Sequence, residues 1–369
     1  MTSPTGAVAP PAVEVRGLAK HYGAVVALTD VDVTIAAGEY FVLLGPSGGG
    51  KTTLLRTIGG FHRPTHGQVL LHGNDVGHLP PDKRPTAMVF QSYALFPHMN
   101  VLNNVGYGLK IAGLGKDERR EKSAAALTMV GLDGYADRKP HELSGGQQQR
   151  VQLARAMVLE RDILLLDEPL AALDAQLRKD MCLELKHLQH ELGMTFIHVT
   201  HNQEEAMTVA DRIALIADGE LVEVGPAKEV YRAPRRRFTA SFVGENNIFE
   251  GTVTNVEGAV VSVDVAGTNV AVDPDGQDVA VGAAVSLSIR SELVKLTTRG
   301  ADIATDPGAS LPATYKEAVY LGLTTSHLAD IDGGGEVVSR VVEDLDEDVA
   351  QGTPVLAYWN REDLRLHTS

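Results

Sequence analysis

Hydrophobic residues along the first two-thirds of the chain follow two alternating patterns. Short apolar runs at residues 39–44, 162–166 and 194–199 are typical of buried strands. Apolar residues at helical spacing over 175–192 predict a helix, and so does the segment 51–58, which follows a glycine-rich turn. Strands that alternate with helices in this way predict a parallel sheet covered by helices.

The pattern changes after residue 242. The runs 253–265, 284–289, 314–321 and 336–342 are rich in β-branched residues and are separated by Gly and Asp. No long segment with helical spacing remains there. This part of the chain therefore predicts a small antiparallel barrel or a pair of barrels.

The charge changes at the same place. The 369-residue chain has a formal net charge of −15, and residues 244–369 carry 21 acidic against 7 basic side chains. We therefore expect two domains, 13–243 and 244–369, after a flexible N-terminus at 1–12. Because so acidic a chain is repelled by phosphate backbones, we expect no nucleic-acid partner.

Composition excludes several other classes of protein. Hydrophobic residues (44%) and charged residues (22%) have the balance of a globular protein. No apolar run approaches the roughly 18–20 residues of a membrane-spanning helix, and the N-terminus lacks the features of a signal peptide. Cys182 is the only cysteine, so an intramolecular disulfide and a thiolate zinc site are excluded. The simplest expectation is a cytoplasmic protein.

A glycine-rich loop joins the first of these strands to the first helix. Residues 45–52 read Gly-Pro-Ser-Gly-Gly-Gly-Lys-Thr and fit the phosphate-loop pattern G-x-x-x-x-G-K-[ST]. Glycines let successive N–H groups surround a phosphate, and the helix that follows adds its positive N-terminal end. Lys51 supplies a cation for the β- and γ-phosphates, and the Thr52 hydroxyl can coordinate Mg²⁺. The loop therefore predicts nucleotide binding.

Two acids end a second apolar strand. Asp167 can hold Mg²⁺ through water, and Glu168 can orient or deprotonate an attacking water molecule. Seen alone, these two acids would fit an ordinary polar turn after a strand equally well. Together with Lys51, it favours phosphoryl-transfer chemistry.

A serine and two glycines open another helix. Residues 143–150 read Leu-Ser-Gly-Gly-Gln-Gln-Gln-Arg, so the helix start and the Ser144 hydroxyl can face an anion. The alternative is an ordinary N-cap. The pattern alone does not decide between them.

From about Val13 to Gly244 the chain resembles the ATP-binding subunits of ABC transporters. The resemblance is carried, in order, by Walker A at 45–52, the signature at 143–147 and Walker B ending at Asp167-Glu168. It implies an α/β P-loop NTPase fold with a helical subdomain at about 92–158, ATP and Mg²⁺ as cofactors, and a head-to-tail homodimer. In that dimer the signature of one copy reaches the γ-phosphate held by the other.

The resemblance assigns four further roles. It implies that Tyr22 stacks on adenine, Gln91 contacts Mg²⁺ and the attacking water, Asp174 contacts the opposite subunit and His201 contacts the γ-phosphate. Strand alternation places His198 on the opposite face, so we expect it to be structural. The expected residues are Glu168, His201, Gln91 and Lys51 (catalytic); Tyr22, Gly45, Pro46, Ser47, Gly48, Gly49, Gly50, Lys51, Thr52 and Thr53 (ATP-binding); Ser144, Gly145, Gly146 and Gln147 (signature); Asp174 (dimer loop); and Thr52, Gln91 and Asp167 (Mg²⁺).

Departures from the family pattern are small. Gly49 stands where many relatives have Cys or Ser, and Ala171 replaces a frequent Ser, which weakens one contact across the dimer. Neither change removes a catalytic group. We therefore expect active ATP hydrolysis.

The resemblance also indicates what the ATPase drives. The apolar segment 92–99 corresponds to the border of a groove that receives a permease helix; its alternative is a core loop. Residues 240–249 and 288–292, in a β-rich region, resemble the OB-like accessory (TOBE) domain of binding-protein-dependent importers, and lean toward the polyamine branch rather than iron or sugar. The implied partners are separate permease subunits and, indirectly, a solute-binding protein, with the chain peripheral on the inner face of the cell membrane.

Two other classes of nucleotide-binding protein fit less well. A soluble ABC ATPase of DNA repair or translation would carry a coiled-coil insertion or two fused cassettes with basic extensions. A GTPase would carry an Asn-Lys-x-Asp motif. This chain has one cassette, an acidic second part and no such motif.

Overall fold

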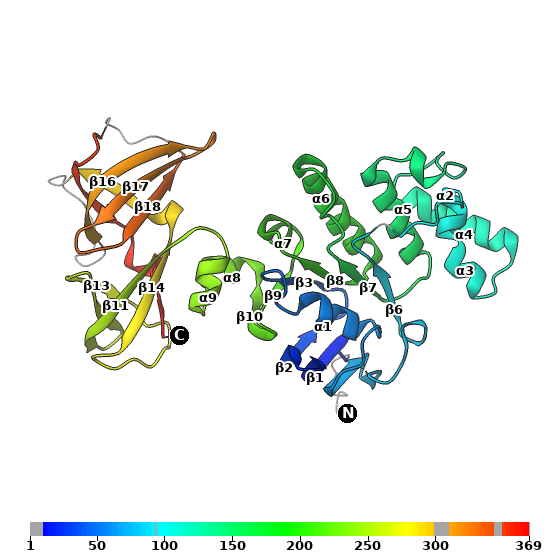
Figure 1. Ribbon diagram of the computed structural model, residues 1–369, viewed down its shortest axis with the longest axis horizontal. Helices are drawn as coiled ribbons and strands as arrows, with labels where there is room; N and C mark the ends of the chain where they lie inside the picture. Colours follow the sequence, from blue (N-terminus) through cyan, green and yellow to red (C-terminus); the bar gives the residue numbers. More distant parts are fainter. Residues whose placement is uncertain (1–9, 93, 299–309, 343–348, 369) are drawn as a thin grey trace, which may run out of the picture. The chain divides into compact units, whose positions relative to one another are not determined.

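The computed structural model describes residues 10–92, 94–298, 310–342 and 349–368 (Figure 1). The chain divides into two compact units, Met1–Lys228 and Glu229–Ser369. Nine residues of the predicted flexible N-terminus, 1–9, lie outside the described residues, as does Tyr93 of the apolar segment 92–99. Ala12 is buried, and its carbonyl accepts a hydrogen bond from the His72 N–H group.

A six-stranded sheet forms the centre of the first unit. Its order is β10-β9-β3-β8-β7-β6, in which five strands are parallel and β10 runs antiparallel to β9. Its central strands are buried on both faces, as expected for parallel strands between layers. The predicted α/β fold is confirmed. The strands are β3 Tyr40–Leu44, β6 Thr86–Val89, β7 Ile163–Asp167, β8 Thr195–Thr200, β9 Arg212–Ala217 and β10 Glu220–Pro226.

Helix α1 (Lys51–Ile58) packs between this sheet and a second, antiparallel one of order β2-β1-β4-β5. Its apolar residues Leu54, Leu55 and Ile58 share one core with side chains of both sheets. This packing fixes the helix that begins at the phosphate loop. The strands of the second sheet are β1 Val13–Tyr22, β2 Val25–Ile35, β4 His66–Leu71 and β5 Asn74–Asp75.

The remaining helices of the first unit form two groups (Figure 1). Helices α6 and α7 contact each other, and α7 contacts strands β3 and β8. Helix α5 contacts α2, α4 and strand β6. No helix in the described ranges is long and apolar enough to cross a membrane. The helices of the first unit are α2 Val101–Val105, α3 Tyr107–Ile111, α4 Lys116–Met129, α5 Gly145–Met157, α6 Ala175–Leu192 and α7 Gln203–Val209. Helix α8 Ala227–Arg232 spans the division between the units, and α9 Arg237–Phe242 lies in the second unit.

Two five-stranded antiparallel sheets make up the second unit, in the orders β13-β12-β11-β14-β20 and β15-β19-β16-β17-β18. They curl around one apolar core, which contains Trp359 stacked on Phe249 at 5.7 Å between ring centroids. The predicted all-β, OB-like domain is confirmed. The strands are β11 Asn246–Glu257, β12 Val260–Val265, β13 Thr268–Val272, β14 Ala284–Arg290, β15 Lys295–Thr298, β16 Ser310–Tyr320, β17 Thr325–Ile331, β18 Glu336–Val341, β19 Pro354–Tyr358 and β20 Arg365–His367.

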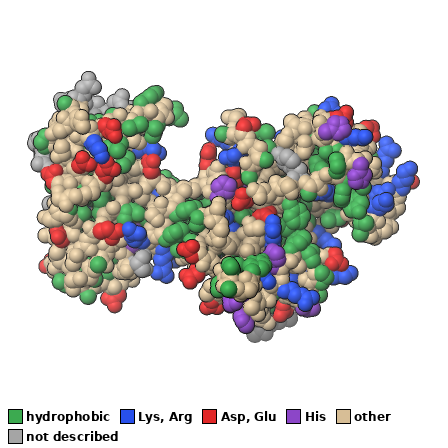
Figure 2. Space-filling model, viewed as in Figure 1, with side chains coloured by type: hydrophobic (Ala, Val, Ile, Leu, Met, Phe, Trp, Pro, Cys, Tyr) green, Lys and Arg blue, Asp and Glu red, His purple; other side chains and the backbone are tan. Residues whose placement is uncertain are grey.

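The turn between β16 and β17 exposes apolar side chains. Tyr320, Leu321 and Leu323 lie there, and Leu323 is 89% exposed. Figure 2 shows green side chains gathered at the free end of this hairpin. Single exposed apolar residues are ordinary, but a contiguous group of them is less so.

Candidate ATP-hydrolysis site

The glycine-rich loop leaves the carboxyl end of β3 in a conformation that needs glycine. Gly45, Gly48 and Gly50 have positive φ angles of 151°, 82° and 107°. A Cβ atom at Gly45 would lie 2.0 Å from the carbonyl oxygen of Ile216, and one at Gly49 would lie 2.9 Å from the same oxygen. The loop therefore packs its backbone directly on β9, and the glycine at position 49 suits this close approach.

Lys51 lies inside the loop. Its Nζ atom donates hydrogen bonds to the carbonyl oxygens of Gly45 (2.9 Å) and Pro46 (2.7 Å), and the residue is 4% exposed. Burial lowers the pKa of the Lys51 ammonium group. The loop thus holds a cation where a phosphate loop places its β- and γ-phosphates.

Two oxygen-bearing side chains meet below the loop. The Thr52 hydroxyl donates to Oδ1 of Asp167 at 3.0 Å, and Oδ2 of Asp167 lies 3.2 Å from Nη2 of Arg56. Mg²⁺ prefers oxygen ligands and usually keeps water and phosphate oxygens, so these residues fit that ion. Within the described ranges, no group of three or more His, Cys, Asp or Glu residues forms a dedicated metal cage.

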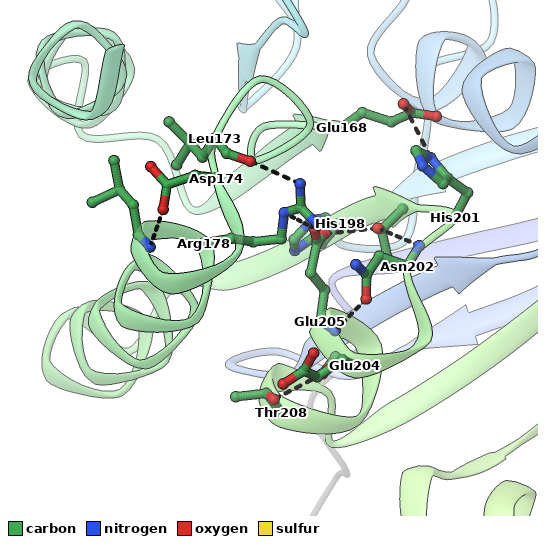
Figure 3. Close-up of polar contacts among 12 residues, drawn as sticks. Glu168, Leu173, Asp174, Arg178, His198, His201, Asn202, Glu204, Glu205 and Thr208 are labelled. Atoms are coloured by element: carbon green, nitrogen blue, oxygen red, sulfur yellow. Dashed lines mark hydrogen bonds and ion pairs between the residues drawn. The ribbon is translucent and has the colours of Figure 1, made fainter. Parts of the chain in front are cut away.

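Three predicted catalytic side chains, Gln91, Glu168 and His201, meet at the carboxylate of Glu168, and Figure 3 shows His201 beside it. Nε2 of Gln91 lies 3.3 Å from Oε2 of Glu168, and Nδ1 of His201 lies 3.4 Å from the same oxygen. Gln91, Glu168 and His201 follow strands β6, β7 and β8, which are neighbours in the parallel sheet. Because parallel strands end at the same edge, residues distant in sequence come together there.

Glu168 also has an unusual backbone conformation. Its φ is +47°, which is uncommon for a residue with a side chain, and its N–H group donates to the carbonyl of Val199 at 3.0 Å. Strain of this kind is typical of functional sites. The turn places the carboxylate beside Gln91 and His201 at the end of the strands, where it can orient a water molecule.

Tyr22 lies at the end of β1. The residue is 44% exposed, and its ring packs edge-on against His62 at 5.6 Å and has Nζ of Lys20 4.8 Å from its centroid. An aromatic face held by neighbours yet open to solvent can stack on a base.

The signature and the dimer loop both open helices. The Ser144 hydroxyl accepts the Gln147 N–H group at 3.4 Å, and the Gln147 side chain accepts the Ser144 N–H group at 3.0 Å, a reciprocal capping box at the start of α5. Asp174 caps α6 by accepting the Leu177 N–H group at 3.0 Å. Capping and anion binding are compatible, since the first N–H groups of a helix lack acceptors within it.

Sequence reasoning missed two residues that hold the loop around Gln91. Nε2 of Gln152 donates to the carbonyls of Phe90 (2.8 Å) and Ser92 (3.3 Å), and Nη1 of Arg155 donates to that of Ala94 (2.7 Å). Gln152 is 2% exposed. The available signal was a pair of long polar side chains three residues apart on the signature helix, which places them on one face.

Comparison with known proteins places this site in a family. Residues 28–171 match the ABC transporter family, and residues 287–366 match the TOBE domain family. The spermidine/putrescine import ATP-binding protein PotA of Roseobacter denitrificans is 47% identical over 333 residues, which are 90% of each chain. The PotA proteins of Rubrobacter xylanophilus (46% identical, covering 90% of this chain and 86% of that one) and Acidothermus cellulolyticus (41%, covering 95% and 93%) are similar.

Solved structures resemble the first part of the chain. A dimeric, post-hydrolysis structure of the ATP-binding cassette MJ0796 with ADP and Pi is 34% identical, with a TM-score of 0.53, and covers 58% of this chain and 98% of that one. The structure of cbiO1 from Clostridium perfringens, part of the ABC transporter complex cbiONQ, is 30% identical, with a TM-score of 0.56, and covers 60% and 90%.

The phosphate loop, the paired acids and the α/β fold define an ATP-binding, ATP-hydrolysing subunit of a transport system. The chain belongs to the ABC transporter ATP-binding subunits of the importer type, which join this ATPase to a TOBE domain. These relatives give no support to the alternative of a soluble ABC ATPase in DNA repair or translation.

Proposed function

We propose that this chain is the ATPase of a polyamine importer, in which two copies bind two Mg²⁺-ATP and drive uptake of spermidine and putrescine through a separate permease. The convergence of Gln91 and His201 on Glu168 carries the hydrolytic part of the proposal. The solute is supported by relatives named for spermidine/putrescine import that align with 90% of this chain.

The roles follow from the geometry. Lys51 and the N–H groups of the phosphate loop bind the β- and γ-phosphates, and Tyr22 stacks on adenine. Thr52, Asp167 and Gln91 would hold Mg²⁺, which when bound neutralises phosphate charge. Glu168 orients the attacking water and accepts its proton, because its carboxylate lies between Gln91 and His201, the residues proposed to contact that water and the γ-phosphate. The remaining proposed contacts to the nucleotide come from Gly45, Pro46, Ser47, Gly48, Gly49, Gly50, Thr53 and His201.

A second copy completes each site in this proposal. The partner's Ser144, Gly145, Gly146 and Gln147 cap the γ-phosphate with a helix start, where negative charge is favoured, and Asp174 lies at the contact between the copies. The related cassette MJ0796 is dimeric with ADP and Pi, which supports this arrangement. ATP then favours the closed dimer, and hydrolysis lets it open.

Coupling to transport uses the segment after Gln91. Leu95 and Phe96 are half-buried, and Phe96 packs on Tyr107 at 4.6 Å, so this segment offers apolar side chains on an ordered base for a permease helix. A solute-binding protein delivers polyamine to the permease. The subunit then lies in the cytoplasm, peripheral to the inner face of the membrane, with an ATPase domain at 13–243, its helical subdomain at about 92–158 and an accessory domain at 244–369.

Replacing Glu168 with Gln tests the proposal. Glu168→Gln keeps the size of the side chain but removes the base, so ATP hydrolysis should fall at least about 100-fold. ATP should still bind, and light scattering should show an ATP-dependent dimer. Polyamine uptake into cells that depend on this subunit should fall in parallel.

The control for this experiment is Glu191→Gln, an exposed glutamate near the C-terminal end of α6, the end opposite to Asp174. It should leave hydrolysis, dimerisation and uptake at the level of the unchanged protein. Hydrolysis by Glu168→Gln at the unchanged rate would contradict the catalytic role. If uptake of labelled spermidine and putrescine does not depend on the subunit, the assignment of polyamines as the transported solutes would be wrong.

A further inference from the structure

Glu205 is a buried carboxylate beside the hydrolytic site that the proposed mechanism does not use. It lies in the first turn of α7 and is 5% exposed. Its Oε2 atom accepts the Thr200 hydroxyl at 2.7 Å, and its Oε1 atom lies 3.4 Å from Nε of Arg178 (Figure 3). A charge buried this deeply requires partners, because desolvation of an unpaired carboxylate is costly.

One side of Glu205 fixes the turn that carries His201. The Asn202 N–H group donates to the Thr200 hydroxyl oxygen at 3.0 Å, and the Glu205 N–H group donates to the Asn202 side chain at 3.1 Å. Both neighbours of His201 are therefore bonded, directly or through one hydroxyl, to Glu205. His201 in turn lies 3.4 Å from Glu168.

The other side of Glu205 leads to the dimer loop. Arg178 extends from α6, and its Nη2 atom donates to the carbonyl of Leu173 at 2.8 Å. Leu173 directly precedes Asp174, the cap of α6, and the loop begins at Glu168, whose carbonyl accepts the Ala171 N–H group at 3.3 Å. The contacts thus form a closed ring from Glu168 through the loop, Arg178, Glu205 and the His201 turn back to Glu168.

Arg178 is the cation that balances Glu205 in this ring. The nearby His198 lies 3.7 Å from Oε2 of Glu205, but it is fully buried and hydrogen-bonded to the Tyr40 hydroxyl at 3.1 Å. Burial lowers the pKa of His198 to about 3, so its imidazole is neutral at physiological pH. Removal of Arg178 would therefore leave a buried carboxylate without a cation.

We propose that Glu205 and Arg178 are positioning residues that hold the His201 turn and the Leu173–Asp174 loop in one fixed arrangement around Glu168. The γ-phosphate contact and the subunit contact then change together, so that neither can engage without the other. This inference rests on the roles proposed above for His201 and Asp174. It predicts effects on turnover rather than on ATP affinity, because neither residue lies in the phosphate loop or beside Tyr22.

A double-mutant cycle on the full chain tests this link. Glu205→Gln keeps the size of the side chain and a hydrogen bond to Thr200, and Arg178→Gln removes the cation. Each should lower the kcat for ATP about 10- to 100-fold, the range expected when a catalytic group is misplaced, while KM for ATP stays within about twofold. The double variant should be no slower than the slower single variant, since both break the same link.

Matched controls come from the adjacent positions. Glu204→Gln and Lys179→Gln alter exposed side chains one residue along the same helices and should leave kcat unchanged. Arg178→Lys, which keeps the charge, should recover part of the lost kcat. Circular dichroism melts establish whether each variant is folded. If a glutamine variant does not fold, the kcat and KM of Arg178→Lys are used to test the positioning role instead.

The outcomes separate this inference from the proposed function. Folded variants with unchanged kcat, a loss of kcat matched by a rise in KM, or additive losses in the double variant would each overturn the positioning role. If Glu168→Gln loses hydrolysis while Glu205→Gln and Arg178→Gln keep it, only this inference fails. If Glu168→Gln keeps hydrolysis, the proposed function fails.

Discussion

At the residue scale, a buried histidine beside the site makes the stability of the fold depend on pH. His198 is fully buried and hydrogen-bonded to the Tyr40 hydroxyl, and its imidazole is neutral because burial lowers its pKa to about 3. In the unfolded chain the same imidazole takes up a proton near pH 6.5. Acid therefore favours the unfolded state at this position.

The prediction concerns the stability of the first unit between pH 6.5 and 5. Across this window the unfolded state binds a proton that the folded state does not, so His198 should reduce the free energy of unfolding by up to about 1.4 kcal/mol per pH unit as the pH falls. His198→Asn keeps an acceptor for Tyr40 without a titratable group and should show a shallower pH dependence. Urea unfolding at pH 7, 6 and 5 measures both slopes; equal slopes would contradict the prediction.

Residue types at the site could be predicted from the sequence where spacing along the chain defines them. The phosphate loop and the pair Asp167-Glu168 are contiguous, so their chemistry is visible in one segment. Glu205 and Arg178 were not predicted, because their roles depend on a contact between two helices that the sequence does not reveal. His198 was predicted to be structural, and its burial agrees with that prediction.

At the element scale, helix α5 contributes to two parts of the site, the signature and the loop around Gln91. Its N-terminus carries Ser144, and its third turn holds the backbone around Gln91 through Gln152. The start of this helix was predictable from its cap, but its contacts to the loop were not, since they bridge about sixty positions in the sequence. Gln149 lies on the same helix and is fully buried, and its amide has no hydrogen-bond partner among the described residues.

The pair Gln152→Met and Gln149→Met separates these two kinds of buried amide. Gln152→Met removes two hydrogen bonds that hold the Gln91 loop, so kcat for ATP should fall about tenfold at nearly constant KM. Gln149→Met removes an amide without partners, so it should keep kcat and raise the free energy of unfolding by about 1 kcal/mol. Steady-state kinetics and urea unfolding check both, and equal kcat in the two variants would contradict the role of Gln152.

At the scale of the whole molecule, two compact units carry separate cores. The sequence pattern changes near residue 243, whereas the compact division falls after Lys228. The reason is visible in the second unit, where buried Arg290 donates hydrogen bonds to the carbonyls of Tyr231 and Val243 and so ties the segment around α9 to β14. The change of pattern after residue 242 and the change of charge place this segment in the first domain, but tertiary contacts join it to the second unit.

The single tryptophan, Trp359, allows the two units to be followed separately. It lies in the core of the second unit, whereas the match to the ATP-binding ABC transporter family lies in the first. Ligand at 100 times its Kd stabilises the binding unit by about 2.7 kcal/mol. We expect ATP to shift the main circular dichroism transition upward in urea and to leave the Trp359 fluorescence transition in place. Equal shifts of both signals would show that the units unfold as one.

The lone thiol of the chain has a practical consequence. Cys182 is buried on α6, and burial raises its pKa to about 12, so almost no thiolate forms at neutral pH. Maleimide dyes and thiol-reactive spin labels should therefore not react with the folded native chain. A cysteine introduced at any exposed site becomes the sole point of attachment, so distances between the two copies of the proposed dimer can be recorded during turnover without first removing a natural residue.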